Sequence, residues 1–247
     1  MENKCKIYIV THKKFQVPNN SIYEPIQVGK KRTNIDLKIT SDDTRDNIAD
    51  KNANYCELTA LYWIWKNIKK VKVIGICHYR RYFTKLKWSN KEKFFLKQKD
   101  INRLLDKYEI IVPKKTKLKK YSVKDWYVKC DGREKDLVTT KKVIEELFPD
   151  YAKSYETVLQ QSEAFYCNMF IMKKELMDKY CEWLFKILSL VEEKTDLSDY
   201  SPTEARIYGY LSEILLNVWV LKNKLNYCEI PVVNIETSLK WKLQHRN

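Results

Sequence analysis

The stretch VKVIGICHYRRYF, residues 71–83, joins a mostly apolar run to a cluster of charged side chains. Its first part, 71–77, has the composition of a strand that is buried in a sheet. His78, Arg80 and Arg81 follow at once. Because burial of an unpaired charge costs several kcal/mol, these side chains must either reach solvent or meet an anion. The stretch therefore predicts a core strand that ends at an anion-binding position, with ordinary surface ion pairing of the two arginines as the alternative.

Other segments of the chain alternate between strand and helix patterns. Apolar runs at 4–13, 108–113 and 164–174 resemble 71–77 in composition. In 54–70, apolar residues recur at intervals of three and four, which predicts a helix with one face on a core. This alternation predicts an α/β fold with a mostly parallel sheet and helices on both faces. Further helices are expected over 98–107, 136–147, 174–193 and 203–223.

Two of the three histidines follow predicted strands: His12 ends the first apolar run, and His78 ends the second. Parallel sheets bind ligands outside the carboxyl ends of their strands. If the two strands are neighbours, both histidines lie on one edge of the sheet and face the same ligand. The alternative is that each is a hydrogen-bonded histidine that terminates a strand.

Composition and length describe a globular chain, with 44% hydrophobic and 13% aromatic residues among 247. We find neither a repeat nor a linker, so we expect a single domain over residues 1–247. No apolar run approaches the roughly 20 residues that cross a bilayer, and the first residues lack the features of a signal peptide. The expected location is the cytoplasm.

Charge favours an anionic partner without choosing between partners. The formal net charge is +15, from 47 Lys and Arg against 32 Asp and Glu. Such a surplus suits phosphate groups or an anionic membrane surface. The densest basic stretch is PKKTKLKKYSVK, residues 113–124. We interpret it first as a solvated loop, and second as a contact to a membrane or nucleic acid.

Glycine and cysteine usage excludes several classes of protein. The four glycines, at 29, 75, 132 and 209, form neither a G-x-G-x-x-G turn nor a phosphate-binding P-loop. A bound nucleotide must therefore be held by side chains. The seven cysteines include no C-x-x-C pair, which argues against structural zinc and against a disulfide framework.

A dense polar segment, SDDTRDNIADKNANYCELTA, occupies residues 41–60. Any one of its aspartates could be a helix cap or a turn residue. The segment as a whole has more acidic and amide groups than a cap requires. Lys51, Asn52, Tyr55 and Glu57 add hydrogen-bonding groups that would suit a sugar or a base.

Several blocks of the chain resemble a bacterial family that was first catalogued as a domain of unknown function. The blocks run from about residue 5 to about residue 235, in the family's order: THKK, IQVG, DDTRDNIADKNANYCELTALYWIWKN, GICHYRRYF, YEIIVPKK, FYCNMFIMKKELMDKYCEWLF and ARIYGYLSEILLNVW. Members of this family are associated with capsular and exopolysaccharide gene clusters and are classed as glycosyltransferases. The chain departs from the family pattern at Arg45, where relatives usually have glycine.

The resemblance implies a UDP-sugar-dependent transferase with a single-domain, GT-A-like (Rossmann-like) fold. It implies galactofuranose as the transferred sugar and a lipid-linked glycan as the acceptor, reached from the inner leaflet of the membrane. In many GT-A enzymes a D-x-D pair binds a divalent metal that neutralises the leaving diphosphate. Here HYRR occupies the comparable position, so we expect side chains to replace the metal. Asp42 and Asp43 leave Mg²⁺ or Mn²⁺ open as an alternative.

The residues and the resemblance together give a predicted site. Asp43 is the first choice for the catalytic base and Glu204 the second. The expected acceptor ligands are Asn168, Met169 and Arg206. The expected donor ligands are Thr11, His12, Lys13, Val28, Gly29, Asp42, Asn47, Lys51, Asn52, Glu57, His78, Tyr79, Arg80 and Arg81.

Two other classes of function compete with a transferase. A basic nucleic-acid-binding module would stack Tyr and Trp side chains on bases, but the notable residues gather at strand ends and not along one positive stripe. A metal-dependent phosphodiesterase would use Asp42, Asp43 and His78, but the chain is poor in histidine and shows no recognisable spacing of metal ligands. We therefore expect no nucleic-acid partner.

Overall fold

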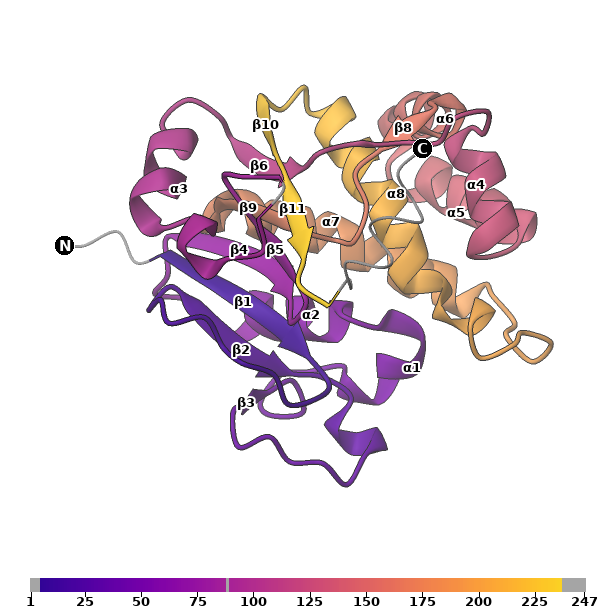
Figure 1. Ribbon diagram of the computed structural model, residues 1–247. Coiled ribbons are helices and arrows are strands. Elements are labelled where there is room, and N and C mark those ends of the chain that lie inside the picture. Colours follow the sequence, from indigo (N-terminus) through magenta and orange to yellow (C-terminus); the bar gives the residue numbers. More distant parts are fainter. Residues whose placement is uncertain (1–4, 88, 237–247) are drawn as a thin grey trace.

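The computed structural model describes residues 5–87 and 89–236. Its centre is a nine-stranded mixed sheet, in which seven strands follow the order β10-β6-β9-β4-β1-β2-β3 and the other two, β5 and β11, form a pair beside β4 (Figure 1). β7 and β8 form a separate ribbon. The strands are β1 (Cys5–Thr11), β2 (Tyr23–Gln27), β3 (Thr40–Ser41), β4 (Val73–His78), β5 (Arg81–Phe83), β6 (Ile110–Pro113), β7 (Thr116–Lys117), β8 (Glu163–Ala164), β9 (Phe170–Lys173), β10 (Tyr227–Ile230) and β11 (Val232–Asn234).

The main strands run in one direction except for β9. Parallel pairing joins β4 to β1, β1 to β2, β2 to β3, and β6 to β10. β9 is antiparallel to both β4 and β6, so those two strands point the same way. Gly75 in β4 lies between Ile7 of β1 and Ile171 of β9, and a Cβ there would come within 3.0 Å of both side chains. Because β1, β2, β3, β4, β6 and β10 all point the same way, their carboxyl ends meet at one edge of the sheet.

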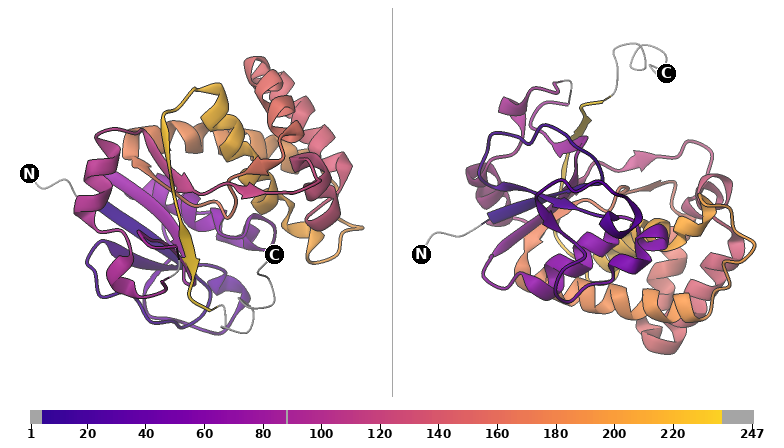
Figure 2. Two further views of the ribbon diagram at one scale, coloured as in Figure 1. Left: turned by 45° about the horizontal axis from the view of Figure 1, so that its top comes forward. Right: turned by 90° about the horizontal axis from the view of Figure 1, so that it is seen from below.

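Helices cover both faces of the sheet, as the sequence predicts (Figures 1 and 2). On one face, Tyr8, Ile74 and Ile76 belong to a core shared with α2, α7 and α8. On the other face, Ile7 and Ile9 pack in a second core with α3 and with β5. Within the described residues no helix is long and apolar enough to cross a membrane. The helices are α1 (Asn52–Tyr55), α2 (Leu58–Asn67), α3 (Gln98–Leu105), α4 (Val123–Cys130), α5 (Glu134–Leu147), α6 (Ala152–Gln160), α7 (Lys174–Glu193) and α8 (Ile207–Lys222).

Two of the predicted elements are divided in the structure. The predicted helix over 54–70 is α1 followed by α2, because Cys56 between them has a φ of 51°. The predicted strand over 164–174 is β8 and β9, separated by a turn in which Cys167 and Asn168 have φ values of 74° and 48°. In both places a non-glycine residue adopts the left-handed conformation, which has no clear sequence signal.

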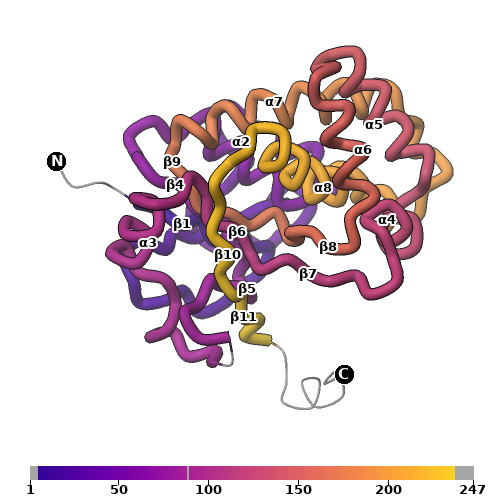
Figure 3. Tube along the Cα trace, turned by 90° about the horizontal axis from the view of Figure 1, so that it is seen from above, coloured from indigo at the N-terminus to yellow at the C-terminus, as the bar shows by residue number. Residues whose placement is uncertain are grey.

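Several short elements were not predicted from the sequence: β2, β10 and β11 in the main sheet, and helices α4 and α6. After β6 the chain leaves the sheet through β7 and reaches α4, α5 and α6, a group of helices visible in Figure 3 beside α8. α4 has only 8 residues and α6 only 9, so few apolar repeats mark them. These helices extend the core of the α8 face beyond the sheet.

Candidate active site at the carboxyl edge of the sheet

A cavity of about 630 Å³ opens at the carboxyl ends of β1, β2 and β4. Val10 of β1 is paired in register with His78 of β4, and His12 follows one residue after β1. Both histidines line the cavity, so the prediction that they share one edge of the sheet is confirmed. At this edge of the sheet, polar side chains therefore border the cavity.

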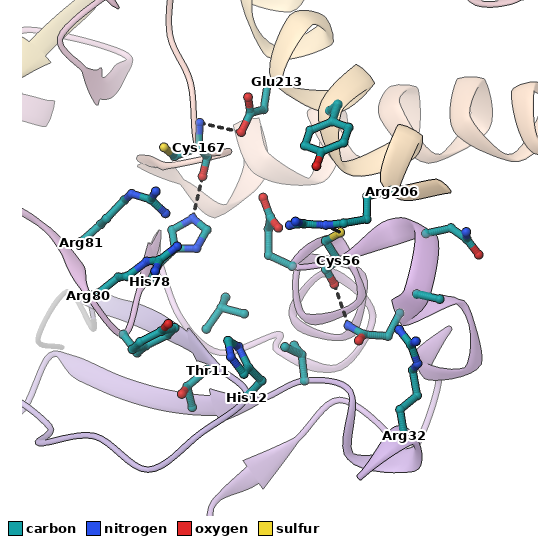
Figure 4. Close-up of a pocket in the computed structure, with 18 of the residues that line it drawn as sticks. Thr11, His12, Arg32, Cys56, His78, Arg80, Arg81, Cys167, Arg206 and Glu213 are labelled. Carbon is teal, nitrogen blue, oxygen red and sulfur yellow. Dashed lines mark hydrogen bonds between the residues drawn. The ribbon is translucent and has the colours of Figure 1, made fainter. Parts of the chain in front are cut away.

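Arginine side chains surround the cavity. Figure 4 shows Arg80 and Arg81, at the turn from β4 into β5, on one side and Arg206, just before α8, on the other. Arg80 is 40% exposed, lies over the Tyr79 ring, and is 3.6 Å from a carboxylate oxygen of Glu236. The Arg206 Nε donates a hydrogen bond to the Cys56 sulfur over 3.1 Å. Guanidinium groups in this arrangement suit an anion with several oxygens.

The two histidines add little positive charge. Burial lowers the pKa of His78. Burial, together with the nearby positive charges of Lys13 and Arg80, also lowers the pKa of His12. The His78 Nε2 lies 2.6 Å from the Cys167 carbonyl oxygen, which can only accept. His78 therefore carries its proton on Nε2 and is neutral near pH 7. This differs from the cationic role predicted for His78, and leaves the positive charge to the arginines.

Two carboxyl groups also line the cavity: Glu57, at the start of α2, and Glu213, on α8. One oxygen of Glu213 accepts a hydrogen bond from the Cys167 backbone N–H over 2.8 Å (Figure 4). Removal from water, and then the nearby charge of Glu57, raise the pKa of Glu213 to about 8. Glu213 can therefore hold or release a proton near neutral pH.

The turn of Cys167 and Asn168 connects these groups. Its strained backbone places the Cys167 carbonyl at His78 and the Cys167 N–H at Glu213. The buried Asn168 amide donates to Glu57 over 2.8 Å and to the Gly209 carbonyl over 3.0 Å. Strain of this kind is found at sites where the surrounding structure fixes the position of functional groups. Asn168 thus acts on the site by positioning Glu57.

Comparison with known proteins places the chain in a family. Residues 6–224 match the family described as a domain of unknown function, DUF4422. The chain belongs to this family. No curated protein matches it.

A solved structure resembles this member of the family over most of its length. It is the apo structure of WbbM, a bifunctional glycosyltransferase, with a TM-score of 0.87 and 30% sequence identity. The match covers 95% of this chain and 46% of that chain, so our chain spans about half the length of the WbbM structure. The likeness supports the predicted GT-A-like α/β fold.

Many of the predicted ligands line the cavity of this family member. At Gly29 a side chain would collide with the Asn52 amide oxygen, 2.7 Å from a Cβ placed there, and the φ of 68° also favours glycine. The lack of a side chain at Gly29 therefore leaves room for the Asn52 amide in the cavity wall. The predicted residues that line the cavity are Thr11, His12, Val28, Asn52, Glu57, His78, Tyr79, Arg80, Arg81 and Arg206.

The other predicted ligands do not line this cavity. Asp42 is completely buried, with one oxygen accepting the Thr59 hydroxyl hydrogen over 2.5 Å. Met169 is fully buried and lines a neighbouring cavity instead. Lys51 pairs with Glu192 at 2.5 Å, Lys13 pairs with Glu236 at 3.0 Å, and Asn47 donates to the carbonyl of Arg45 in its own loop.

Neither predicted base lines the cavity. Asp43 accepts a hydrogen bond from the Ser41 hydroxyl over 2.6 Å. Glu204 pairs with Arg133 at 2.9 Å, and this hydrogen-bonded pair lowers the pKa of Glu204 to about 2. A carboxyl group with so low a pKa is a weak proton acceptor. The physical reason for the difference is that each carboxyl group is satisfied elsewhere: Asp43 by Ser41 in its own turn, and Glu204 by Arg133, which is distant in sequence.

Several residues that line the cavity were given no role from the sequence. Glu213 has the clearest signal, because it is a lone acidic residue in the apolar stretch GYLSEILLNVWV, 209–220. Within 5–87 and 89–236, no three His, Cys, Asp or Glu side chains are grouped as a metal site. The missed residues include Arg32, Cys56, Cys167, Tyr210 and Glu213.

Proposed function

We propose that this member of the family is a glycosyltransferase that moves a sugar from a nucleotide-sugar donor to a glycan acceptor. The observation that carries the proposal is the cavity in which guanidinium groups face two carboxyl groups, one of them with a pKa of about 8. A diphosphate needs the first and proton removal from a hydroxyl needs the second. The likeness to WbbM supports the same class of reaction.

The arginines have the role of stabilising the leaving group. Arg80 and Arg81 hold the diphosphate, whose negative charge grows as the bond to the sugar breaks. Arg206 closes the opposite side of the cavity. Thr11, His12 and Val28, at the ends of β1 and β2, contact the nucleoside. Asn52 and Glu57 bind hydroxyl groups of the ribose or the transferred sugar.

Glu213 is the base in this proposal, in place of Asp43 and Glu204. The acceptor hydroxyl oxygen forms a bond to the anomeric carbon, and its proton passes to the Glu213 carboxylate. The bond from that carbon to the diphosphate oxygen breaks, and its electron pair leaves with the nucleoside diphosphate. Glu213 suits this role because it lines the cavity and titrates near the working pH.

The finer assignment follows from the family resemblance. The donor is a UDP-sugar, with galactofuranose as the transferred group. The acceptor is a growing capsular or other cell-surface polysaccharide on a lipid carrier. The enzyme works in the cytoplasm at the inner face of the membrane, to which its basic surface attaches it peripherally.

Titration of UDP by calorimetry tests the proposal. We expect UDP to bind the unaltered chain, and Arg80→Ala or Arg81→Ala to weaken binding by about 1.5–3 kcal/mol, the value of a hydrogen bond to a charged group. Arg103→Ala is the matched control and should leave affinity unchanged, because Arg103 is in α3 and does not line the cavity. Equal UDP affinity in all four proteins, or binding of oligonucleotides in place of UDP, would contradict the proposal.

A further inference from the structure

A second cavity, of about 360 Å³, adjoins the first. Arg81 and Cys167 line both cavities, so the two are neighbours along the carboxyl edge of the sheet. The second cavity lies at the ends of β6 and β10, where Pro113 and Pro231 belong to its wall. Apart from Arg81, none of the residues assigned above to the donor lines it.

The wall of the second cavity is positively charged. Arg81, Lys87, Lys114 and Lys115 line it, and its described lining includes no Asp or Glu. Lys115 is held in place, because its Nζ lies 5.5 Å from the centre of the Phe165 ring and 3.5 Å from a Glu163 oxygen. A cavity with this lining favours a ligand that brings its own negative charge.

The floor of the cavity suits the body of such a ligand. Met169 is completely buried there, and Tyr166 contributes to the wall. Among the described residues, the buried Tyr166 hydroxyl has no hydrogen-bond partner, which is costly unless a ligand or a water satisfies it. Burial, and then the charge of Glu213, raise the pKa of Tyr166. Tyr166 therefore connects the second cavity electrostatically with the proposed base.

We propose, on the basis of the proposed function, that the second cavity is the acceptor subsite and that it takes an acceptor bearing a phosphate group. The reacting hydroxyl must meet the donor at the junction of the two cavities. Glu213 is at this junction, because it accepts from the N–H of Cys167, which lines both. The phosphate then lies toward Lys114 and Lys115, one or two sugar units from the new bond.

A sugar phosphate and a glycan linked through diphosphate to a lipid share this chemistry. Calorimetry on protein saturated with UDP keeps the donor cavity filled while three probes are compared. The probes are glucose 1-phosphate, a farnesyl diphosphate-linked glucose and the neutral methyl glucoside. We expect both phosphate-bearing probes to bind more tightly than the neutral one. Tighter binding of the farnesyl probe identifies the lipid carrier as the source, and equal binding identifies the sugar phosphate.

Matched lysine variants locate the binding. Lys114→Gln/Lys115→Gln should weaken phosphate-probe binding at least about tenfold, whereas Lys119→Gln/Lys120→Gln, from the same basic stretch, should not change it. Lys114→Gln alone keeps the Lys115 ion pair and should show part of the loss. Equal affinity in both double variants, or no preference for phosphate, overturns the inference while UDP binding still supports the transferase. Failure of the unaltered chain to bind UDP rejects both proposals.

Discussion

Glu213 shows at the residue scale how little of the chemistry the sequence displays. Within its stretch it looks like an isolated polar position on an apolar helix. Its raised pKa depends on Glu57, which is far away in sequence, and on loss of water in the folded cavity. Asp43 and Glu204 were more conspicuous, because they lie in polar segments. In the fold, Ser41 in the same segment satisfies Asp43, whereas Glu204 is satisfied by Arg133, which is distant in sequence.

The proposed base gives a pH prediction. A carboxyl group accepts a proton only when ionised, so kcat/KM should rise as pH increases through a midpoint near the Glu213 pKa of about 8. Glu57→Gln removes a charge that raises this pKa, so the midpoint should move to lower pH. The amide oxygen of the substituted side chain can still accept from Asn168, which preserves the local contact.

Rate measurements from about pH 6 to about pH 9.5 would show the shift. Glu204→Gln is the matched control, because Glu204 does not line the cavity and is paired with Arg133. Its midpoint should equal that of the unaltered chain. An unmoved midpoint in Glu57→Gln would mean that Glu213 is not the group that controls the rate.

At the scale of elements, strong patterns were predicted correctly and left-handed turns were not. The apolar run 71–77 and the charges after it form β4 and its turn into β5, as the sequence indicates. The breaks at Cys56 and at Cys167 were missed, because tertiary contacts hold these residues at positive φ. Arg45 also has a positive φ, 52°, at a position where the family resemblance implies glycine. The backbone at Arg45 thus has the left-handed conformation that glycine adopts most easily, although the residue is arginine.

The end of β4 gives a prediction about metal. If Arg80 and Arg81 neutralise the leaving diphosphate, treatment with EDTA should leave most of the transfer rate in place. Loss of a metal that stabilised the leaving group would remove several kcal/mol, and about 1.36 kcal/mol is a factor of ten in rate. Product formation from a UDP-sugar, with and without added Mn²⁺, distinguishes the cases. Activity that disappears with EDTA and returns with Mn²⁺ would reject the arginine mechanism.

At the scale of the whole molecule, the sequence predicted the α/β class, the two-sided covering of the sheet and the edge that holds the cavity. These follow from long apolar runs and helical periodicity, which many residues encode together. The direction of β9 was not predictable, because a short apolar run does not indicate which way a strand points in the sheet. The partition into two cavities was not predictable either, since it depends on side chains from distant segments.

The net charge of +15 gives a prediction about membrane attachment. Lys119→Glu/Lys120→Glu should reduce binding to phosphatidylglycerol vesicles, since each lysine near an anionic surface contributes about 1 kcal/mol. Activity on a short soluble acceptor should not change. The control is Lys179→Glu/Lys186→Glu, which makes the same change in net charge on α7. Figure 3 shows α7 on the opposite side of the molecule from β7. Equal loss of vesicle binding in both variants would indicate a response to net charge and no specific membrane face.

The reversed strand β9 also constrains the order in which the chain can acquire its structure. β4 gains its second neighbour only when Phe170–Lys173 has been synthesised, long after β4 itself. Until then one side of an almost wholly apolar strand has unpaired backbone groups, and such an edge attracts strands of other chains. Pairing between segments so far apart is also slow, because a long loop must close first. On the ribosome, association between nascent chains therefore competes with folding until β9 emerges.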